Sequence, residues 1–141
     1  SVENQEFYID DLKTIIKEKK LDNNVLFIPF NNQMDRIWQA VDIAVVPSTE
    51  PESFGLVAVE AMLAKKPVIA ANHGGLKEII KNKETGFLIE PNNVQELTNA
   101  IKLLVNDKQL RLEMGEQGYL RALEKFSIQK YVSKIEKVLL D

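Results

Sequence analysis

Residues 43–71 read IAVVPSTEPESFGLVAVEAMLAKKPVIAA and place two short apolar runs on either side of a helical segment. The runs Ile43–Pro47 and Pro67–Ala71 do not alternate between apolar and polar residues, which is typical of strands covered on both faces. The segment Leu56–Ala64 between them is apolar enough for a buried helix. A strand, a helix and a second strand with short connections predict a right-handed crossover between parallel strands.

The same alternation extends in both directions from this stretch. Two more apolar runs, Val25–Ile28 and Gly86–Ile89, are expected to be buried strands. Segments with helical periodicity predict helices around residues 9–16, 34–41, 76–81 and 94–104, and from Ile128 onward. The helix at 94–104 would be capped by Asn92 or Asn93, and Asp107 would cap a further helix that runs to about Glu124. The fold class is therefore expected to be α/β, a Rossmann-like doubly wound parallel sheet with helices on both faces and a helical C-terminal end.

Ligands of such sheets bind beyond the carboxyl ends of the strands. In this sequence those ends lead into residues 29–33, 47–55 and 72–75. The chain opens with a helix, whereas a doubly wound domain normally opens with a strand, so we expect a segment upstream of Ser1 to be missing.

Composition excludes several classes of site and partner. The chain has 141 residues, a net charge of -3, no cysteine and one histidine, which rules out disulfides and thiolate metal sites and disfavours a histidine zinc site. No block of lysine and arginine indicates a nucleic-acid partner, and no apolar stretch approaches the length of a membrane span. A cytoplasmic protein is the expectation, with the cytoplasmic face of a membrane as the alternative for the full-length protein.

Glu60 lies in the middle of Leu56–Ala64, where eight of nine residues are apolar. We expect this helix to be buried, and a buried carboxylate must be paired, protonated or directed into a cleft. No lysine or arginine stands three or four positions away to form a local salt bridge. Two explanations stay open: a structural bond to a distant basic residue or to backbone amides, and a bond to the hydroxyls of a ligand diol.

The loop before this helix ends in Gly55, at the expected helix N-terminus. Backbone N–H groups there, together with the helix dipole, favour an anion, and glycine allows a phosphate to approach closely. Glu52 lies eight positions before Glu60, and the helix rises about 7.5 Å from Gly55 to Glu60 at about 1.5 Å per residue. One carboxylate therefore precedes the anion site and the other follows it, an order that suits a nucleoside diphosphate sugar.

Seven short motifs follow one another along the chain: Pro47-Ser48, Glu52-Ser53-Phe54-Gly55-Leu56-Val57, Glu60-Ala61-Met62, Pro67-Val68-Ile69-Ala70, Gly74-Gly75, Glu78-Ile79-Ile80 and Thr85-Gly86-Phe87-Leu88. This ordered set, and above all the two glutamates separated by seven residues, resembles the family 4 retaining glycosyltransferases of the GT-B fold. The resemblance covers about Val25 to Leu104. It implies transfer of a hexosyl unit with retention of anomeric configuration, in polysaccharide or glycolipid assembly, without a metal or cofactor.

The resemblance also implies roles for particular residues. Glu60 would bind the ribose hydroxyls, and Glu52, as the catalytic residue, would contact the transferred sugar near the reacting centre. Backbone amides would hold the sugar and the diphosphate around Phe54, Gly55, Leu56 and Val57. The nucleobase pocket would be formed by Ile28, Pro29, Phe30 and Met34, with UDP preferred over GDP on family frequency.

By this resemblance, residues 1–141 are part of the C-terminal, donor-binding domain, and the acceptor-binding N-terminal domain is absent from the chain. Family members carry an arginine and a lysine upstream that neutralise the diphosphate, so we expect weak nucleotide-sugar binding and no turnover by this chain alone. Lys65 replaces the family's usual glycine, a structural cost at a left-handed helix end. The amphipathic segment from Ile128 is expected to pack on the missing domain, or otherwise to form a dimer.

Two other functions stay open on the same fold: a noncatalytic nucleotide-binding or interaction module, and a sugar-nucleotide epimerase or phosphorylase. Both glutamates are present, which disfavours the first, and Phe54-Gly55-Leu56 with the seven-residue spacing favours a transferase over the second. His73 is expected in a partly exposed loop, with a contact to phosphate or acceptor as the alternative. Trp38 is expected in the core rather than as a stacking platform.

Overall fold

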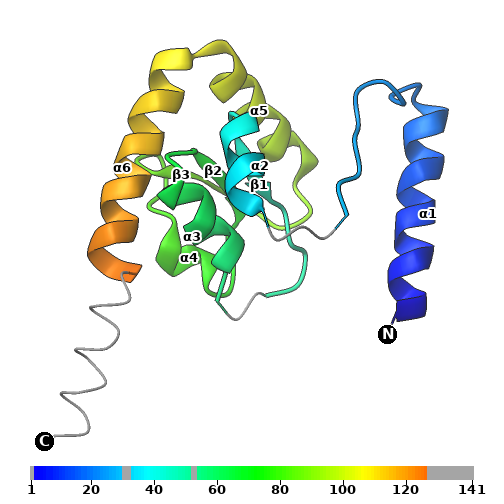
Figure 1. Cartoon of the computed structure of the whole chain (residues 1–141), viewed down its shortest axis with the longest axis horizontal. Coiled ribbons are helices and arrows are strands. Elements are labelled where there is room, and N and C mark those ends of the chain that lie inside the picture. The colour runs from blue at the N-terminus through cyan, green and yellow to red at the C-terminus, as the bar shows by residue number, and fades with distance from the viewer. Residues whose placement is uncertain (1, 30–32, 52–53, 127–141) are drawn as a thin grey trace, which may run out of the picture. The chain divides into compact units, whose positions relative to one another are not determined.

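A computed structural model of the chain describes residues 2–29, 33–51 and 54–126 (Figure 1). It consists of two compact units, Ser1–Asn32 and Gln33–Asp141. The predicted closing helix from Ile128 lies outside the described residues.

The first unit is a helix followed by an irregular segment. Helix α1 covers Val2–Glu18, and the chain leaves it through Lys20, whose φ of 56° is left-handed. The predicted strand at Val25–Ile28 is wrong, because these residues form no strand and their side chains are exposed, Leu26 by 82%. A strand is stable only when a neighbouring strand takes up its backbone hydrogen bonds, and the described part of this unit contains no sheet. The apolar composition of these residues is typical of a strand, but composition does not show whether a neighbouring strand is available to pair with it.

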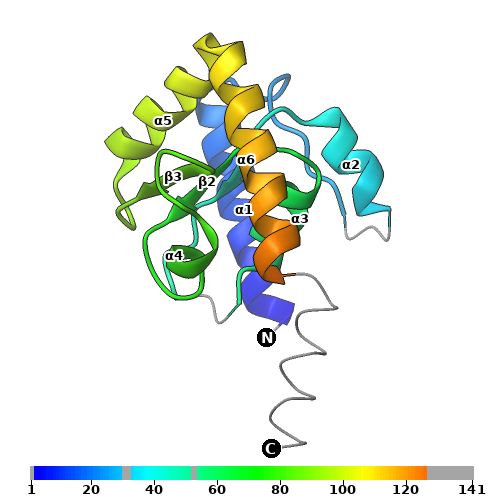
Figure 2. The ribbon, with the colours of Figure 1, turned by 90° about the vertical axis from the view of Figure 1, so that its left-hand side faces the viewer.

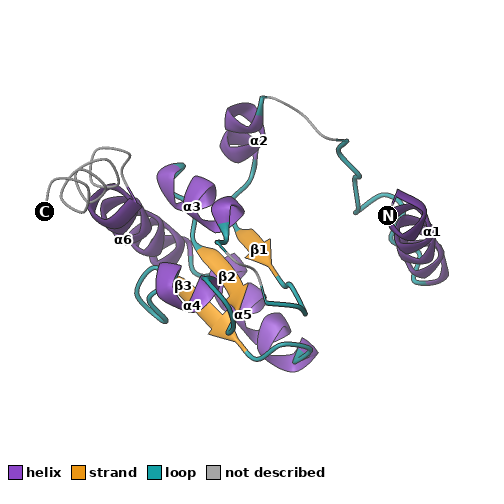
Figure 3. Ribbon diagram, turned by 90° about the horizontal axis from the view of Figure 1, so that it is seen from below, coloured by secondary structure: helices purple, strands orange, loops and turns teal. Residues whose placement is uncertain are grey.

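The second unit is built on a parallel sheet of three strands in the order β1-β2-β3 (Figure 3). The strands are β1 Ala44–Val46, β2 Val68–Ala71 and β3 Gly86–Ile89. Ala44 pairs with Val68, and Val68 pairs in turn with Gly86, so the three strands start level with one another. These strands confirm three of the four predicted apolar runs.

Within residues 33–51 and 54–126, five helices accompany the sheet: α2 Met34–Ala40, α3 Leu56–Leu63, α4 Leu76–Ile79, α5 Val94–Asn106 and α6 Lys108–Phe126. Two of the predicted caps are confirmed. The side-chain oxygen of Asn93 accepts a hydrogen bond from the N–H of Glu96 at 3.0 Å, and Asp107 accepts one from the N–H of Leu110 at 2.9 Å. Each bond satisfies one backbone donor in the first turn of its helix, which fixes where α5 and α6 begin.

Apolar side chains form two separate cores, as expected for a sheet with helices on both faces. Along β2, Val68 and Ala70 belong to the larger core with residues of α3 and α4, whereas Ile69 belongs to the smaller core with Ala100 and Leu104 of α5. This division follows from the geometry of a strand, in which successive side chains point to opposite faces. The fully apolar sequence of β2 is explained by burial on both sides.

Helix α6 passes alongside α3 and contacts the connection that follows it (Figure 2). Gly115 packs so closely that a Cβ atom there would lie 2.1 Å from the carbonyl oxygen of Lys65. Lys65 has the predicted left-handed conformation, with φ of 59°, and its ammonium group lies 2.9 Å from Glu116 and 4.7 Å from the ring centre of Tyr119. Contacts with α6 therefore accompany this left-handed position, where the resemblance led us to expect glycine.

The end of α4 is also held by α6. The guanidinium of Arg121 donates hydrogen bonds to the carbonyl oxygens of Ile79 at 2.8 Å and Glu78 at 2.7 Å. A helix leaves its last carbonyl groups without donor partners of its own, so the arginine takes the role of a C-terminal cap from more than forty residues away.

Candidate functional site

The carboxyl ends of β1 and β2 carry the two connections that were expected to meet a ligand. β1 leads into residues 47–55 and β2 into residues 72–75. Because these strands are parallel neighbours, the two connections leave the same edge of the sheet. They are joined by a hydrogen bond of 2.5 Å between Nε2 of His73 and the carbonyl oxygen of Ser48.

Gly55 marks the start of α3 and has a left-handed φ of 67°. Any Cβ atom there would lie 2.9 Å from terminal side-chain carbons of both Leu76 and Ile79, so these side chains would have to shift, and the left-handed conformation itself favours glycine. The carbonyl oxygen of Gly55 accepts bonds from the N–H groups of Ala58 and Val59. The amides of the two residues before them therefore have no acceptor inside the helix, which is the arrangement of an anion-binding helix N-terminus.

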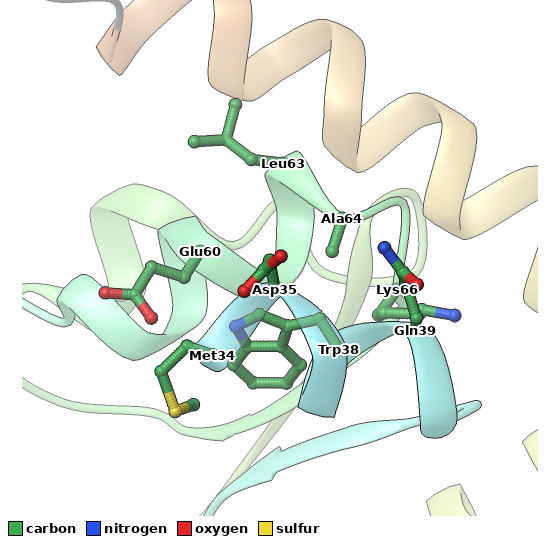
Figure 4. Close-up of a pocket in the computed structure, with 8 residues that line it drawn as sticks. All are labelled: Met34, Asp35, Trp38, Gln39, Glu60, Leu63, Ala64 and Lys66. Atoms are coloured by element: carbon green, nitrogen blue, oxygen red, sulfur yellow. The ribbon is translucent and has the colours of Figure 1, made fainter. Parts of the chain in front are cut away.

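A cavity of about 460 Å³ lies between α2 and α3 (Figure 4). Its lining consists of Met34, Asp35, Trp38 and Gln39 from α2 and Glu60, Leu63, Ala64 and Lys66 from α3 and the turn after it. The structure thus brings together Met34, predicted for the nucleobase pocket, and Glu60, predicted for the ribose.

The expectation that Glu60 is buried is wrong. Helix α3 buries Ala58, Val59, Ala61 and Met62, whereas Glu60 is exposed and Leu56 is exposed by 61%. The reason is that the sheet and α6 cover only part of the helix surface, and the uncovered face includes the wall of the cavity. An exposed carboxylate carries no burial cost that a structural partner must offset, so the structure gives no reason for a bond from Glu60 to a distant basic residue.

Trp38 belongs to the core and to the cavity wall at once. It is partly buried and packs against the larger core, as predicted, but its ring also lines the cavity beside Glu60. Its indole nitrogen is buried and has no hydrogen-bond partner among the residues that the structure describes. Sequence reasoning did not assign Trp38, Asp35 or Gln39 to the site, although a spacing of four residues from Met34 places Trp38 on the same side of α2.

The remaining predicted site residues divide into three groups. Phe54 and Val57 are about half exposed at the start of α3, where backbone amides can meet a ligand. Ile28 and Pro29 lie in the first unit and are exposed. Phe30 and Glu52 lie outside the described residues.

Neither a metal cluster nor a membrane span accompanies this site in the described part of the chain. Among residues 2–29, 33–51 and 54–126, no group of three or more histidine, aspartate or glutamate side chains is arranged to hold a metal ion. Within the same ranges, no helix is long and apolar enough to cross a membrane.

Comparison with known protein families gives a match to "Glycosyl transferases group 1" over residues 8–121. An uncharacterized glycosyltransferase of Haemophilus influenzae is 32% identical over 131 residues, which are 92% of this chain and 36% of that protein. The alpha-1,3/1,6-mannosyltransferase ALG2 of Dictyostelium discoideum is 33% identical over 133 residues, which are 94% of this chain and 31% of that protein. The chain thus spans about a third of the length of these relatives.

Solved structures give the same assignment of fold. The crystal structure of Anabaena HepE in complex with UDP superposes with a TM-score of 0.93 at 33% identity, covering 96% of this chain and 37% of that one. The complex of the same protein with UDP-glucose gives a TM-score of 0.90 at 34% identity, covering 95% of this chain and 37% of that one.

Proposed function

Because this chain belongs to the group 1 glycosyl transferases, we propose that it supplies the donor-binding part of a retaining glycosyltransferase. The longer protein would transfer a hexosyl unit from a nucleoside diphosphate sugar to a glycan, lipid or other acceptor. The observation that carries this proposal is the cavity between α2 and α3, which Met34 and Glu60 line together.

The cavity offers suitable chemistry for a nucleoside. The ring of Trp38 and the side chain of Met34 supply apolar surface for a base, and the exposed carboxylate of Glu60 can accept hydrogen bonds from two ribose hydroxyls. A carboxylate that accepts from a diol forms charge-assisted bonds, which are stronger than bonds between neutral groups. Glu60 would therefore contribute affinity for the ribose rather than stability of the fold.

The start of α3 would receive the diphosphate. The backbone amides at Leu56 and Val57 have no acceptor inside the helix, and the left-handed Gly55 allows close approach. Glu52, in the same loop, would contact the transferred sugar. Lys66 lines the cavity wall rather than the loop at the start of α3. The family resemblance implies that an arginine and a lysine of the longer protein neutralise the diphosphate. For this reason we expect weak donor binding and no turnover by the chain alone.

UDP is the preferred nucleotide, and its binding to Anabaena HepE supports that choice. The test is calorimetric titration of this chain with UDP, GDP and ADP, each with and without an attached sugar. We expect one nucleotide series to bind. Glu60→Gln should weaken that binding roughly 10- to 100-fold, because loss of bonds to a charged acceptor costs about 1.5–3 kcal/mol.

Two controls make this test specific. Glu124→Ala removes an exposed carboxylate from α6, far along the chain from the cavity lining, and should leave the affinity unchanged. Glu60→Gln should also leave the free energy of unfolding unchanged, because the side chain is exposed. Equal binding by the Glu60 variant would place the nucleoside elsewhere, and absence of binding by a longer protein that includes the upstream segment would favour the noncatalytic alternative. The anomeric configuration of the product formed by the longer protein tests retention.

A further inference from the structure

His73 connects two segments that are 25 positions apart in the sequence. Its Nε2 atom lies 2.5 Å from the carbonyl oxygen of Ser48, and the ring is partly buried. A carbonyl oxygen can only accept a hydrogen bond, so Nε2 must carry the hydrogen and donate it. The bond therefore joins the turn after β2 to the first residues of the β1–α3 loop.

The turn that carries His73 is itself firmly attached to the sheet. The N–H of His73 donates to the carbonyl oxygen of Ala71 at 2.9 Å, and the N–H of Asn72 donates to that of Ile89 at 2.7 Å. The side chain of Asn72 donates to Glu90 at 2.9 Å. These bonds connect the turn to the ends of β2 and β3. The backbone that carries His73 is therefore held by the sheet, and its side chain can restrain the start of the β1–α3 loop through Ser48.

Neither ring nitrogen of His73 is presented to a ligand. Nε2 is occupied by the bond to Ser48, and Nδ1 is buried without a hydrogen-bond partner among the described residues. A histidine that contacted a phosphate or an acceptor would direct one nitrogen toward open space. The geometry instead favours a role within the protein.

We propose that His73 is a positioning residue that holds residues 47–51, the described start of the β1–α3 loop, for recognition of the donor sugar. This inference rests on the proposed function, because residues 47–55 lead to the amides at the start of α3. The bond acts at the beginning of that loop, whereas the cavity between α2 and α3 is lined by other segments. Loss of the bond should therefore impair recognition of the sugar end more than recognition of the nucleoside.

Two variants separate the hydrogen bond from the bulk of the side chain. His73→Leu keeps an apolar side chain of moderate size and removes the donor, whereas His73→Gln provides an amide N–H that can reach a carbonyl acceptor. We would measure amide hydrogen exchange along the unliganded chain, and then affinities for UDP and for UDP-glucose by calorimetry. A merely structural role would lower stability and both affinities together.

We expect His73→Leu to raise exchange at least tenfold at the amides of residues 48–50 and 54–56, with little change in β2 and β3. Affinity for UDP should stay within twofold, while affinity for UDP-glucose falls about tenfold, and His73→Gln should restore both properties. Unchanged exchange in the leucine variant, or equal loss of affinity for both ligands, would overturn the proposal. If the unaltered chain binds neither ligand, the two affinities are measured on a longer protein that includes the upstream segment. Absence of binding there would overturn the proposed function and the sugar-positioning role, whereas the exchange data still decide whether His73 holds the start of the loop.

Discussion

Substitution of Gly115 by alanine should destabilise the protein by about 2 kcal/mol, although alanine is the better helix former. The added Cβ would lie 2.1 Å from the carbonyl oxygen of Lys65 and 2.9 Å from its carbonyl carbon. Real Cβ atoms keep at least 3.0 Å from such neighbours, so the backbone of α6 and the turn after α3 must separate by about 0.9 Å. Overpacking of this kind costs about 1–3 kcal/mol, and a clash between two backbones belongs at the upper end of that range. Replacing a glycine inside a helix by alanine stabilises the helix by about 1 kcal/mol, so the expected net loss of stability is about 2 kcal/mol.

Gly118 provides the matched control, because it lies one turn further along the same helix. A Cβ there would meet the Cγ atom of Met62 at 3.4 Å, which is an ordinary contact with a flexible side chain. Gly118→Ala should therefore be neutral or stabilising by up to about 1 kcal/mol. Urea unfolding of both variants and the parent chain measures their free energies of unfolding. The two variants should differ by about 3 kcal/mol if Gly118→Ala is stabilised by the full increment of about 1 kcal/mol. If Gly115→Ala were as stable as Gly118→Ala, the close packing of α6 on the α3–β2 turn would be refuted.

Three further predictions concern helix ends and charge. Asn93→Ala removes the cap of α5 and should cost about 1 kcal/mol of unfolding free energy in urea, with no loss if the cap bond is absent in solution. Arg121→Met removes two bonds to the end of α4 and should cost about 1–3 kcal/mol, whereas Lys125→Met on the same helix should cost little. The hydrogen bond and charge of Glu116 raise the pKa of Lys65 above its ordinary value of 10.5, so this pair stabilises the folded state below that pH and loses its contribution as the pH rises through the higher folded value. Stability should accordingly fall more steeply above about pH 10.5 in the parent chain than in Glu116→Gln, and parallel pH profiles would exclude the interaction.

The elements of the second unit could largely be predicted from local sequence. Three apolar runs became the three parallel strands, and apolar spacing, an apolar run or a cap predicted each described helix between Met34 and Phe126. The caps at Asn93 and Asp107 were also visible, because a cap bond reaches only three residues along the chain. The predicted strand at Val25–Ile28 was wrong because a strand depends on a partner strand, which local sequence does not specify.

The candidate site was predictable in its residue types and less so in its environment. The cavity contains both Met34 and Glu60, which the resemblance had assigned to the nucleobase and the ribose, but Glu60 is exposed although the helix around it is almost entirely apolar. An apolar composition shows that a helix can be buried on every side. Which sides are covered depends on how many neighbours pack against it, and the face of α3 that borders the cavity is left open by the described part of the chain.

By itself, the sequence determined the α/β class, the order of the elements in the second unit and the caps that begin α5 and α6, because these properties follow from periodicity and from contacts between near neighbours in the chain. Only the tertiary structure decided that Gly115 must lack a side chain, that Arg121 caps α4 and that His73 holds Ser48. Each of these contacts joins residues at least 25 positions apart. Their distances are fixed by the packing of whole helices and strands, so no local pattern in the sequence reveals them.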